Sequence, residues 1–141
     1  IYAARAVAQK MAERGSGYLI NTSSAAGVLT HIKSATYSVT KHAAVAFAEF
    51  LSITYGPSGV KVSVLCPQAV NTAMIQGRED DVASVDGMIE PETLADCVIE
   101  TIEKEEFLIL PHPQVLEYMR RKTGDYDRWL RGMQRLRHEY P

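Results

Sequence analysis

Tyr37 and Lys41 are four residues apart, and Ser24 precedes Tyr37 by thirteen residues. If the chain is helical at this point, positions i and i+4 share a face, so the lysine ammonium can lie beside the tyrosine phenol. A nearby ammonium favours the phenolate, which lets a tyrosine exchange a proton closer to neutral pH. A serine hydroxyl at the end of a preceding strand could hydrogen-bond the reacting oxygen. These three residue types therefore indicate proton transfer to or from a substrate oxygen.

The tyrosine–lysine spacing alone is weak evidence, because Tyr118 and Lys122 repeat it. The second copy has Glu105 where the first has serine, and it lies in an arginine-rich stretch. Such a stretch is typical of a solvated helix face, and we predict that environment for Tyr118 and Lys122. For the first pair, the structural alternative is a tyrosine packed on a helix beside an extended lysine.

The first pair is embedded in three blocks of sequence with a characteristic order. The blocks are Tyr18-Leu19-Ile20-Asn21-Thr22-Ser23-Ser24-Ala25-Ala26-Gly27, Tyr37-x-x-x-Lys41, and Val62-Ser63-Val64-Leu65-Cys66-Pro67-Gln68-Ala69-Val70-Asn71-Thr72. Together they resemble the short-chain dehydrogenase/reductase family, and the resemblance extends over the region 1–110. One position departs from the family pattern: Gln68 stands where a glycine is usual, and glutamine resists turns that glycine permits.

The resemblance implies a catalytic role for three residues. Tyr37 would be the general acid/base, Lys41 would favour its phenolate and bind the nicotinamide ribose, and Ser24 would hold the substrate oxygen. Ser23 competes with Ser24 for that role; the alternative for Ser23 is a hydroxyl in the turn at the strand end.

The resemblance also implies a cofactor, NAD or NADP, and a small-molecule carbonyl/alcohol substrate. Five residues would contact the cofactor: Tyr37, Lys41, Pro67, Val70 and Thr72. Val70 would do so through its backbone and Thr72 through its hydroxyl. The alternative for Thr72 is a helix N-cap. Met74 and Ile75, with the loop beyond them, would then cover the substrate.

Two parts expected of such an enzyme do not occur in the sequence. No Gly-x-x-x-Gly-x-Gly turn follows a strand, and Gly15-Ser16-Gly17 ends a helix instead of starting one. Asn21 lies in the predicted strand, and the family's catalytic asparagine would fall before Ile1. The chain also begins without methionine, inside a helical pattern. We therefore interpret it as the catalytic C-terminal portion of a longer enzyme, inactive by itself.

Composition narrows the class of protein. A hydrophobic content of 46% is that of an ordinary globular domain, and a net charge of −2 argues against nucleic acid as a partner. The sequence contains no apolar run long enough to span a membrane. Cys66 and Cys97 are interpreted as buried free thiols in the reducing cytoplasm, and the four histidines lack metal-ligand spacing.

The hydrophobic pattern predicts strands alternating with helices. Strands are expected at 18–22, 60–65 and 107–110, and helices at 1–14, 35–55 and 91–104, with one or two polar helices after Pro113. The first helix should bury one side, formed by Ile1, Ala4, Val7, Ala8 and Met11. The second should bury Ala43, Ala44, Phe47, Phe50 and Leu51. A long irregular substrate loop, with the acidic run Glu79-Asp80-Asp81, should fill 67–89.

This alternation predicts an α/β fold: the second half of a doubly wound, Rossmann-type parallel sheet. We expect residues 1–112 to form the C-terminal part of an NAD(P)-binding domain and 113–141 a helical extension. The extension carries an apolar stripe of Trp129, Leu130, Met133 and Leu136, which should dock on the subunit or a neighbour; a basic site for an anion is the alternative. The resemblance implies a homodimer or homotetramer.

The second functional hypothesis is a non-catalytic module on the same fold, which binds a dinucleotide or serves in assembly.

Overall fold

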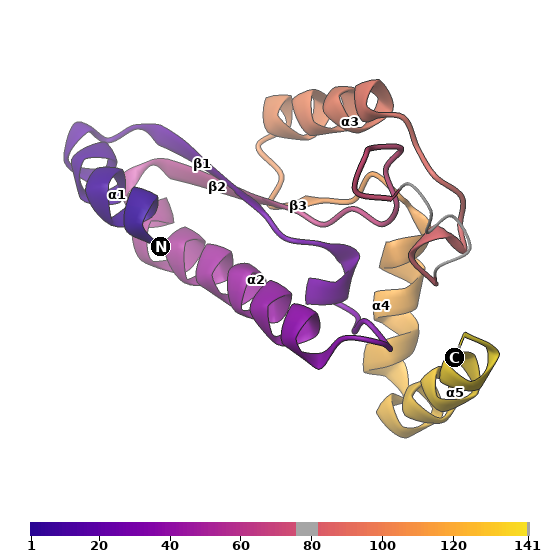
Figure 1. Cartoon of the computed structure of the whole chain (residues 1–141). Helices are drawn as coiled ribbons and strands as arrows, with labels where there is room; N and C mark the ends of the chain where they lie inside the picture. Colours follow the sequence, from indigo (N-terminus) through magenta and orange to yellow (C-terminus); the bar gives the residue numbers. More distant parts are fainter. Residues whose placement is uncertain (76–81, 141) are drawn as a thin grey trace.

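A three-stranded parallel sheet, in the order β1-β2-β3, organises the chain (Figure 1). The computed structural model describes residues 1–75 and 82–140. The strands are β1 (Gly17–Thr22), β2 (Val60–Leu65) and β3 (Leu108–Ile109). The helices are α1 (Tyr2–Arg14), α2 (Ala35–Tyr55), α3 (Pro91–Glu103), α4 (Gln114–Gly124) and α5 (Tyr126–Glu139). Helices α1 and α2 lie on one side of the sheet and α3 on the other, which confirms the predicted α/β class.

Strand β2 is the centre of the sheet. Val60, Val62 and Val64 are each no more than 5% exposed, as expected of a β-branched strand covered on both faces. Its register with β1 runs from Gly17 opposite Val60 to Thr22 opposite Leu65. The two strands therefore end level with one another, and the segments that follow them leave the sheet at the same edge.

Short local signals set the limits of the helices. Helix α1 ends at Gly15, whose φ of 73° is the left-handed conformation that glycine adopts without strain. Helix α2 begins after Ser34, whose Oγ accepts the backbone N–H of Tyr37 at 3.2 Å. Pro91 occupies the first turn of α3. Each of these boundaries matches the sequence prediction to within two residues.

The buried faces of the two long helices differ from the prediction. Helix α2 buries Val45, Ala48 and Leu51, whereas the predicted Phe50 is 56% exposed and Ala43 is also exposed. In α1 only Ala4 and Ala8 are fully buried, and Ile1 is 77% exposed. Leu51 is buried as predicted and Phe47 packs against the core, so the prediction fails for Ala43 and Phe50, which lie on the outer side of α2.

The segments between the regular elements contain more structure than predicted. A 3₁₀ turn, η1 (Ala25–Gly27), follows β1, and another, η3 (Val82–Ser84), lies inside the predicted loop 67–89. Val70 and Ile89 form a parallel bridge that brings the two ends of that loop together. The predicted acidic run Glu79–Asp81 lies outside the described residues. Within the described part of the chain, no helix is both long and apolar enough to cross a membrane.

Candidate active site

An open cavity of about 1450 Å³ lies where β1 and β2 end. All the site residues predicted from the sequence contribute to its lining: Ser24, Tyr37, Lys41, Pro67, Val70 and Thr72. They come from three separate segments, which the level ends of β1 and β2 bring to one edge of the sheet. Met74 and Ile75 also line the cavity, as expected of the loop that should cover a substrate.

Tyr37 and Lys41 lie on the first two turns of α2 and face the same cavity. The Lys41 Nζ atom is 5.4 Å from the centroid of the Tyr37 ring, within the range of a cation–π contact. The His31 ring meets the Tyr37 ring edge-on, with 5.8 Å between their centroids. Tyr37 remains 40% exposed, so its phenol is accessible from the cavity. This arrangement brings an ammonium beside an accessible phenol.

The two adjacent serines have different environments. Ser23 is 3% exposed, and its Oγ donates a hydrogen bond to the Lys41 carbonyl at 2.8 Å. The Ser24 Oγ accepts the Ala26 N–H at 3.2 Å, and its hydroxyl lies at a long 3.4 Å from the Pro67 carbonyl. A bond that long holds the hydroxyl hydrogen only weakly, which leaves it able to turn toward a ligand. Ser24 is therefore the better placed of the two to bind a substrate oxygen.

Two hydrogen bonds hold the start of the segment that follows β2. The Pro67 carbonyl accepts the Ala25 N–H at 2.8 Å, and the Gln68 N–H donates to His112 Nδ1 at 3.2 Å. Among the described residues other than glycine, only Glu105 has a positive φ. Gln68 therefore has a backbone conformation open to any residue, and this position does not require the family's glycine. The Thr72 carbonyl accepts the Ile75 N–H at 3.0 Å in a turn.

The solvated face predicted for Tyr118 and Lys122 is wrong. Lys122 is 8% exposed, and its Nζ donates to the carbonyls of Val28 and Leu29 at 2.9 and 2.8 Å. Its Nζ also lies 5.0 Å from the Trp129 ring centroid. The carbonyls belong to the loop after η1, a contact across more than 90 positions that local composition does not reveal.

Tyr118 is also tied into the fold. Its hydroxyl donates to Asp86 Oδ1 at 2.8 Å. Burial, together with this hydrogen bond, raises the pKa of Tyr118, so the second copy of the motif favours a neutral phenol.

The sequence analysis also missed cavity residues from the C-terminal helices. Helices α4 and α5 contribute lining side chains, among them Arg121, Arg128, Trp129, Met133, Arg135 and Leu136. The predicted apolar stripe was the available signal, since three of its four members line the cavity; the fourth, Leu130, is 43% exposed.

Two buried titratable groups lie behind the cavity. Burial raises the pKa of the Cys66 thiol to about 11, so this cysteine is not a nucleophile at neutral pH. Burial lowers the pKa of His112, whose Nε2 has no hydrogen-bond partner among the described residues. The other cysteine, Cys97, is also a free thiol but only partly buried.

Comparisons with known proteins identify the family of the chain. The family model for the short chain dehydrogenase matches residues 1–83. The 1-deoxy-11-beta-hydroxypentalenate dehydrogenase of Streptomyces exfoliatus is 32% identical over 127 residues, which cover 89% of this chain and 46% of that protein. The 2,5-dichloro-2,5-cyclohexadiene-1,4-diol dehydrogenase of Sphingobium indicum is 39% identical over 77 residues, or 54% of this chain and 31% of that protein.

A solved structure with the same fold is a short chain dehydrogenase/reductase from Burkholderia phymatum in complex with NAD. It superposes with a TM-score of 0.73 at 25% identity, covering 89% of this chain and 54% of that one. The chain thus spans about half the length, or less, of the proteins that it matches. The family match over more than half of its residues shows that the chain belongs to the short-chain dehydrogenase family.

Proposed function

We propose that this chain carries the catalytic portion of an NAD(P)-dependent oxidoreductase that interconverts a carbonyl and an alcohol. The observation that carries the proposal is the convergence of Ser24, Tyr37 and Lys41 on one cavity from two separate elements. The two dehydrogenase relatives have names that specify hydroxylated substrates, a hydroxypentalenate and a cyclohexadienediol, which supports an alcohol as the reduced substrate.

Each side chain has a distinct part in the proposed reaction. The Tyr37 phenol gives a proton to a carbonyl oxygen, or takes one from an alcohol in the reverse direction. The Lys41 ammonium, 5.4 Å from the ring centroid, favours the negative charge on the tyrosine oxygen after that transfer. The Ser24 hydroxyl donates a hydrogen bond to the same substrate oxygen, which lowers the cost of charge developing there.

The cavity has residues suited to the nicotinamide end of NAD(P). It lies at the carboxyl ends of parallel strands, where α/β folds bind dinucleotides. Lys41 would bind the ribose, while Pro67, the Val70 backbone and the Thr72 hydroxyl would contact the nicotinamide. The NAD complex of the Burkholderia phymatum relative supports NAD(P) as the cofactor. When bound, the cofactor supplies or accepts the hydride.

Replacement of Tyr37 by phenylalanine tests the proposal. In the intact protein, Tyr37→Phe should lower kcat for NAD(P)H oxidation across a carbonyl panel on the order of 10²- to 10⁴-fold, the usual contribution of a positioned acid. Tyr2→Phe is the matched control, because Tyr2 is 85% exposed on α1 and far from the cavity lining. Equal turnover by wild type and Tyr37→Phe would refute the mechanism.

Assembly is a second candidate function, favoured by an apolar row on the outer face of α2. Val39, Phe50 and Ile53 are 68%, 56% and 77% exposed, and they follow the i, i+11, i+14 spacing of one helix face. We propose that this face pairs with a second copy of the chain in a homodimer or homotetramer. Sedimentation of Phe50→Glu should show a smaller species than wild type; cofactor binding without turnover of any substrate would favour assembly over catalysis.

A further inference from the structure

Helix α5 presents one side to the cavity. Arg128, Trp129, Met133, Arg135 and Leu136 line it, and they recur at helical spacing, whereas Arg131 and Arg137 of the same helix do not line it. The cavity therefore has a wall that combines apolar side chains with two guanidinium groups. The three sequence blocks that resemble the family contribute none of these residues.

The wall is anchored to the catalytic side of the cavity. Lys122, near the end of α4, donates to the Val28 and Leu29 carbonyls in the loop that follows η1. Its Nζ lies 5.0 Å from the ring centroid of Trp129 on α5. Because Trp129 also lines the cavity, one buried cation links the loop beyond Ser24 to the wall.

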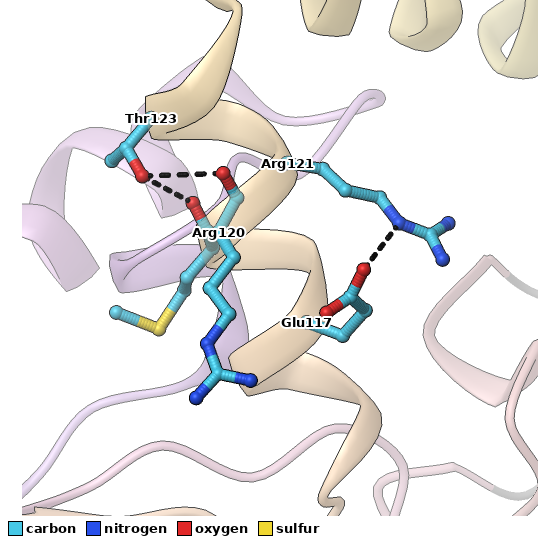
Figure 2. Close-up of polar contacts among 5 residues, drawn as sticks. Glu117, Arg120, Arg121 and Thr123 are labelled. Atoms are coloured by element: carbon cyan, nitrogen blue, oxygen red, sulfur yellow. Dashed lines mark hydrogen bonds and ion pairs between the residues drawn. The ribbon is translucent and has the colours of Figure 1, made fainter.

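Charge on the described lining is predominantly positive. Lysine and arginine contribute five side chains, and Asp125 contributes the one carboxylate. Asp125 Oδ1 already accepts the Arg128 N–H at 2.9 Å as the N-cap of α5. Figure 2 shows that Arg121 Nε binds Glu117 Oε1, at 3.0 Å, while Arg120 points away from that pair. Arg121 is therefore neutralised by its own helix.

Among the residues that the structure describes, Arg128 and Arg135 have no such neutralising partner. Within the described part of the chain, neither guanidinium has a carboxylate at ion-pair distance. The Arg135 Nη2 atom lies beside Gly132, 3.8 Å from where a Cβ at that position would be. The lack of a side chain at Gly132 leaves space on the cavity side of the helix between the two arginines.

We infer that Arg128 and Arg135 bind the anionic group of an otherwise apolar substrate, a hydrophobic carboxylate whose alcohol or carbonyl faces Tyr37. Guanidinium groups bind carboxylates with paired, charge-assisted hydrogen bonds. Trp129, Met133 and Leu136 offer the adjoining apolar surface. This inference rests on the proposed oxidoreductase function and names its substrate class.

Binding can be measured without turnover through the fluorescence of Trp129, the one tryptophan of this sequence, with Trp129→Phe as the baseline. The probes are cyclohexanecarboxylate and its uncharged isostere cyclohexanecarboxamide. Wild type should bind the carboxylate about tenfold more tightly than the amide, and Arg128→Gln/Arg135→Gln should lose that preference. Arg131→Gln, on the same helix but outside the lining, should retain it. Equal affinity of wild type for both probes, or an equal loss in Arg131→Gln, would overturn the inference.

Two further measurements, of NADPH affinity and of turnover, distinguish this inference from its alternatives. If the double variant instead loses affinity for NADPH while keeping its carboxylate preference, the arginines serve the cofactor's phosphates and the inference is wrong. A protein whose Tyr37-dependent turnover shows no preference for 4-hydroxycyclohexanecarboxylate over its methyl ester also overturns it, with the proposed function intact. If the protein binds the carboxylate through these arginines but turns over no substrate, the binding site is supported and the oxidoreductase proposal is refuted.

Discussion

The buried Ser23 hydroxyl donates a hydrogen bond to the backbone carbonyl of Lys41 at 2.8 Å. Ser23 directly follows β1, and Lys41 lies in the second turn of α2. The bond therefore joins the end of the strand to the helix that carries Tyr37. Since Ser24 is the next residue, this one contact helps to set the position of the candidate serine relative to the candidate tyrosine.

Replacing each of the two serines singly by alanine should affect different properties: Ser23 the stability and Ser24 the activity. Ser23→Ala leaves the buried hydrogen bond to Lys41 unmade and should lower the free energy of unfolding by about 1–2 kcal/mol. Ser24→Ala should change it by less than about 1 kcal/mol, while kcat/KM falls on the order of 10²-fold. Denaturant unfolding and steady-state kinetics on the same preparations check both values. A stable Ser23→Ala or a fully active Ser24→Ala would contradict this division of roles.

Gly27→Ala should disturb the same junction from the other side. A Cβ at this position would lie 2.6 Å from the Lys41 carbonyl oxygen and would also overlap the Ser23 Oγ. Both neighbours are fixed by the hydrogen bond between them, so we expect a loss of about 1–3 kcal/mol in thermal or denaturant unfolding. Gly56→Ala is the control, because a Cβ there would have no atom within 4 Å and the φ of −55° at Gly56 suits alanine. Similar losses in both variants would show that packing around Gly27 is not the cause.

Lys122→Met should loosen the C-terminal helices. Removing the ammonium leaves the Val28 and Leu29 carbonyls without this donor, and we expect a loss of about 1–3 kcal/mol. Hydrogen exchange should quicken in residues 28–34 and in α5. Lys10→Met, at an exposed position of α1, should leave both measurements unchanged. Unaltered exchange in α5 would mean that Lys122 does not hold the wall in place.

The stability of the protein should fall with acid through His112. Burial lowers the pKa of His112 below its ordinary value of 6.5, so below that pH the unfolded chain binds a proton that the folded chain resists. Stability is therefore unaffected above this pH and decreases as the pH falls below it, by at most about 1.4 kcal/mol per pH unit, until the folded histidine also protonates.

His112→Asn should remove this dependence, because asparagine cannot be protonated but its side-chain oxygen can still accept the Gln68 N–H. Unfolding curves of wild type and variant between pH 5 and 8 give the difference directly. His138→Asn, at an exposed position of α5, should follow the wild-type curve. If the stability of His112→Asn changes with pH in parallel with that of wild type, this histidine is not the source of the acid sensitivity.

Much of the fold could be predicted because its signals are local. Gly15 ends α1, Ser34 caps α2, and Pro91 begins α3, each through backbone chemistry confined to one turn. The β-branched pattern of 60–65 likewise indicated a buried strand. The candidate site residues were predicted from the resemblance of three sequence blocks to the family. Those blocks follow strands β1 and β2 or begin α2, and parallel strands end at a common edge, so the fold brings them together.

The sequence by itself thus determined the order of elements and which residues gather at one edge of the sheet. Tertiary structure decided which side of α2 is buried: Ala48 lies in the core with the valines of β2, whereas Phe50 is exposed. It also decided that Lys122 is buried, because the Val28 and Leu29 carbonyls that its ammonium binds are distant in sequence. The role of α5 as a cavity wall follows from that anchor. Side-chain spacing is visible along one helix, but the desolvation of a charge depends on what the rest of the chain packs against it.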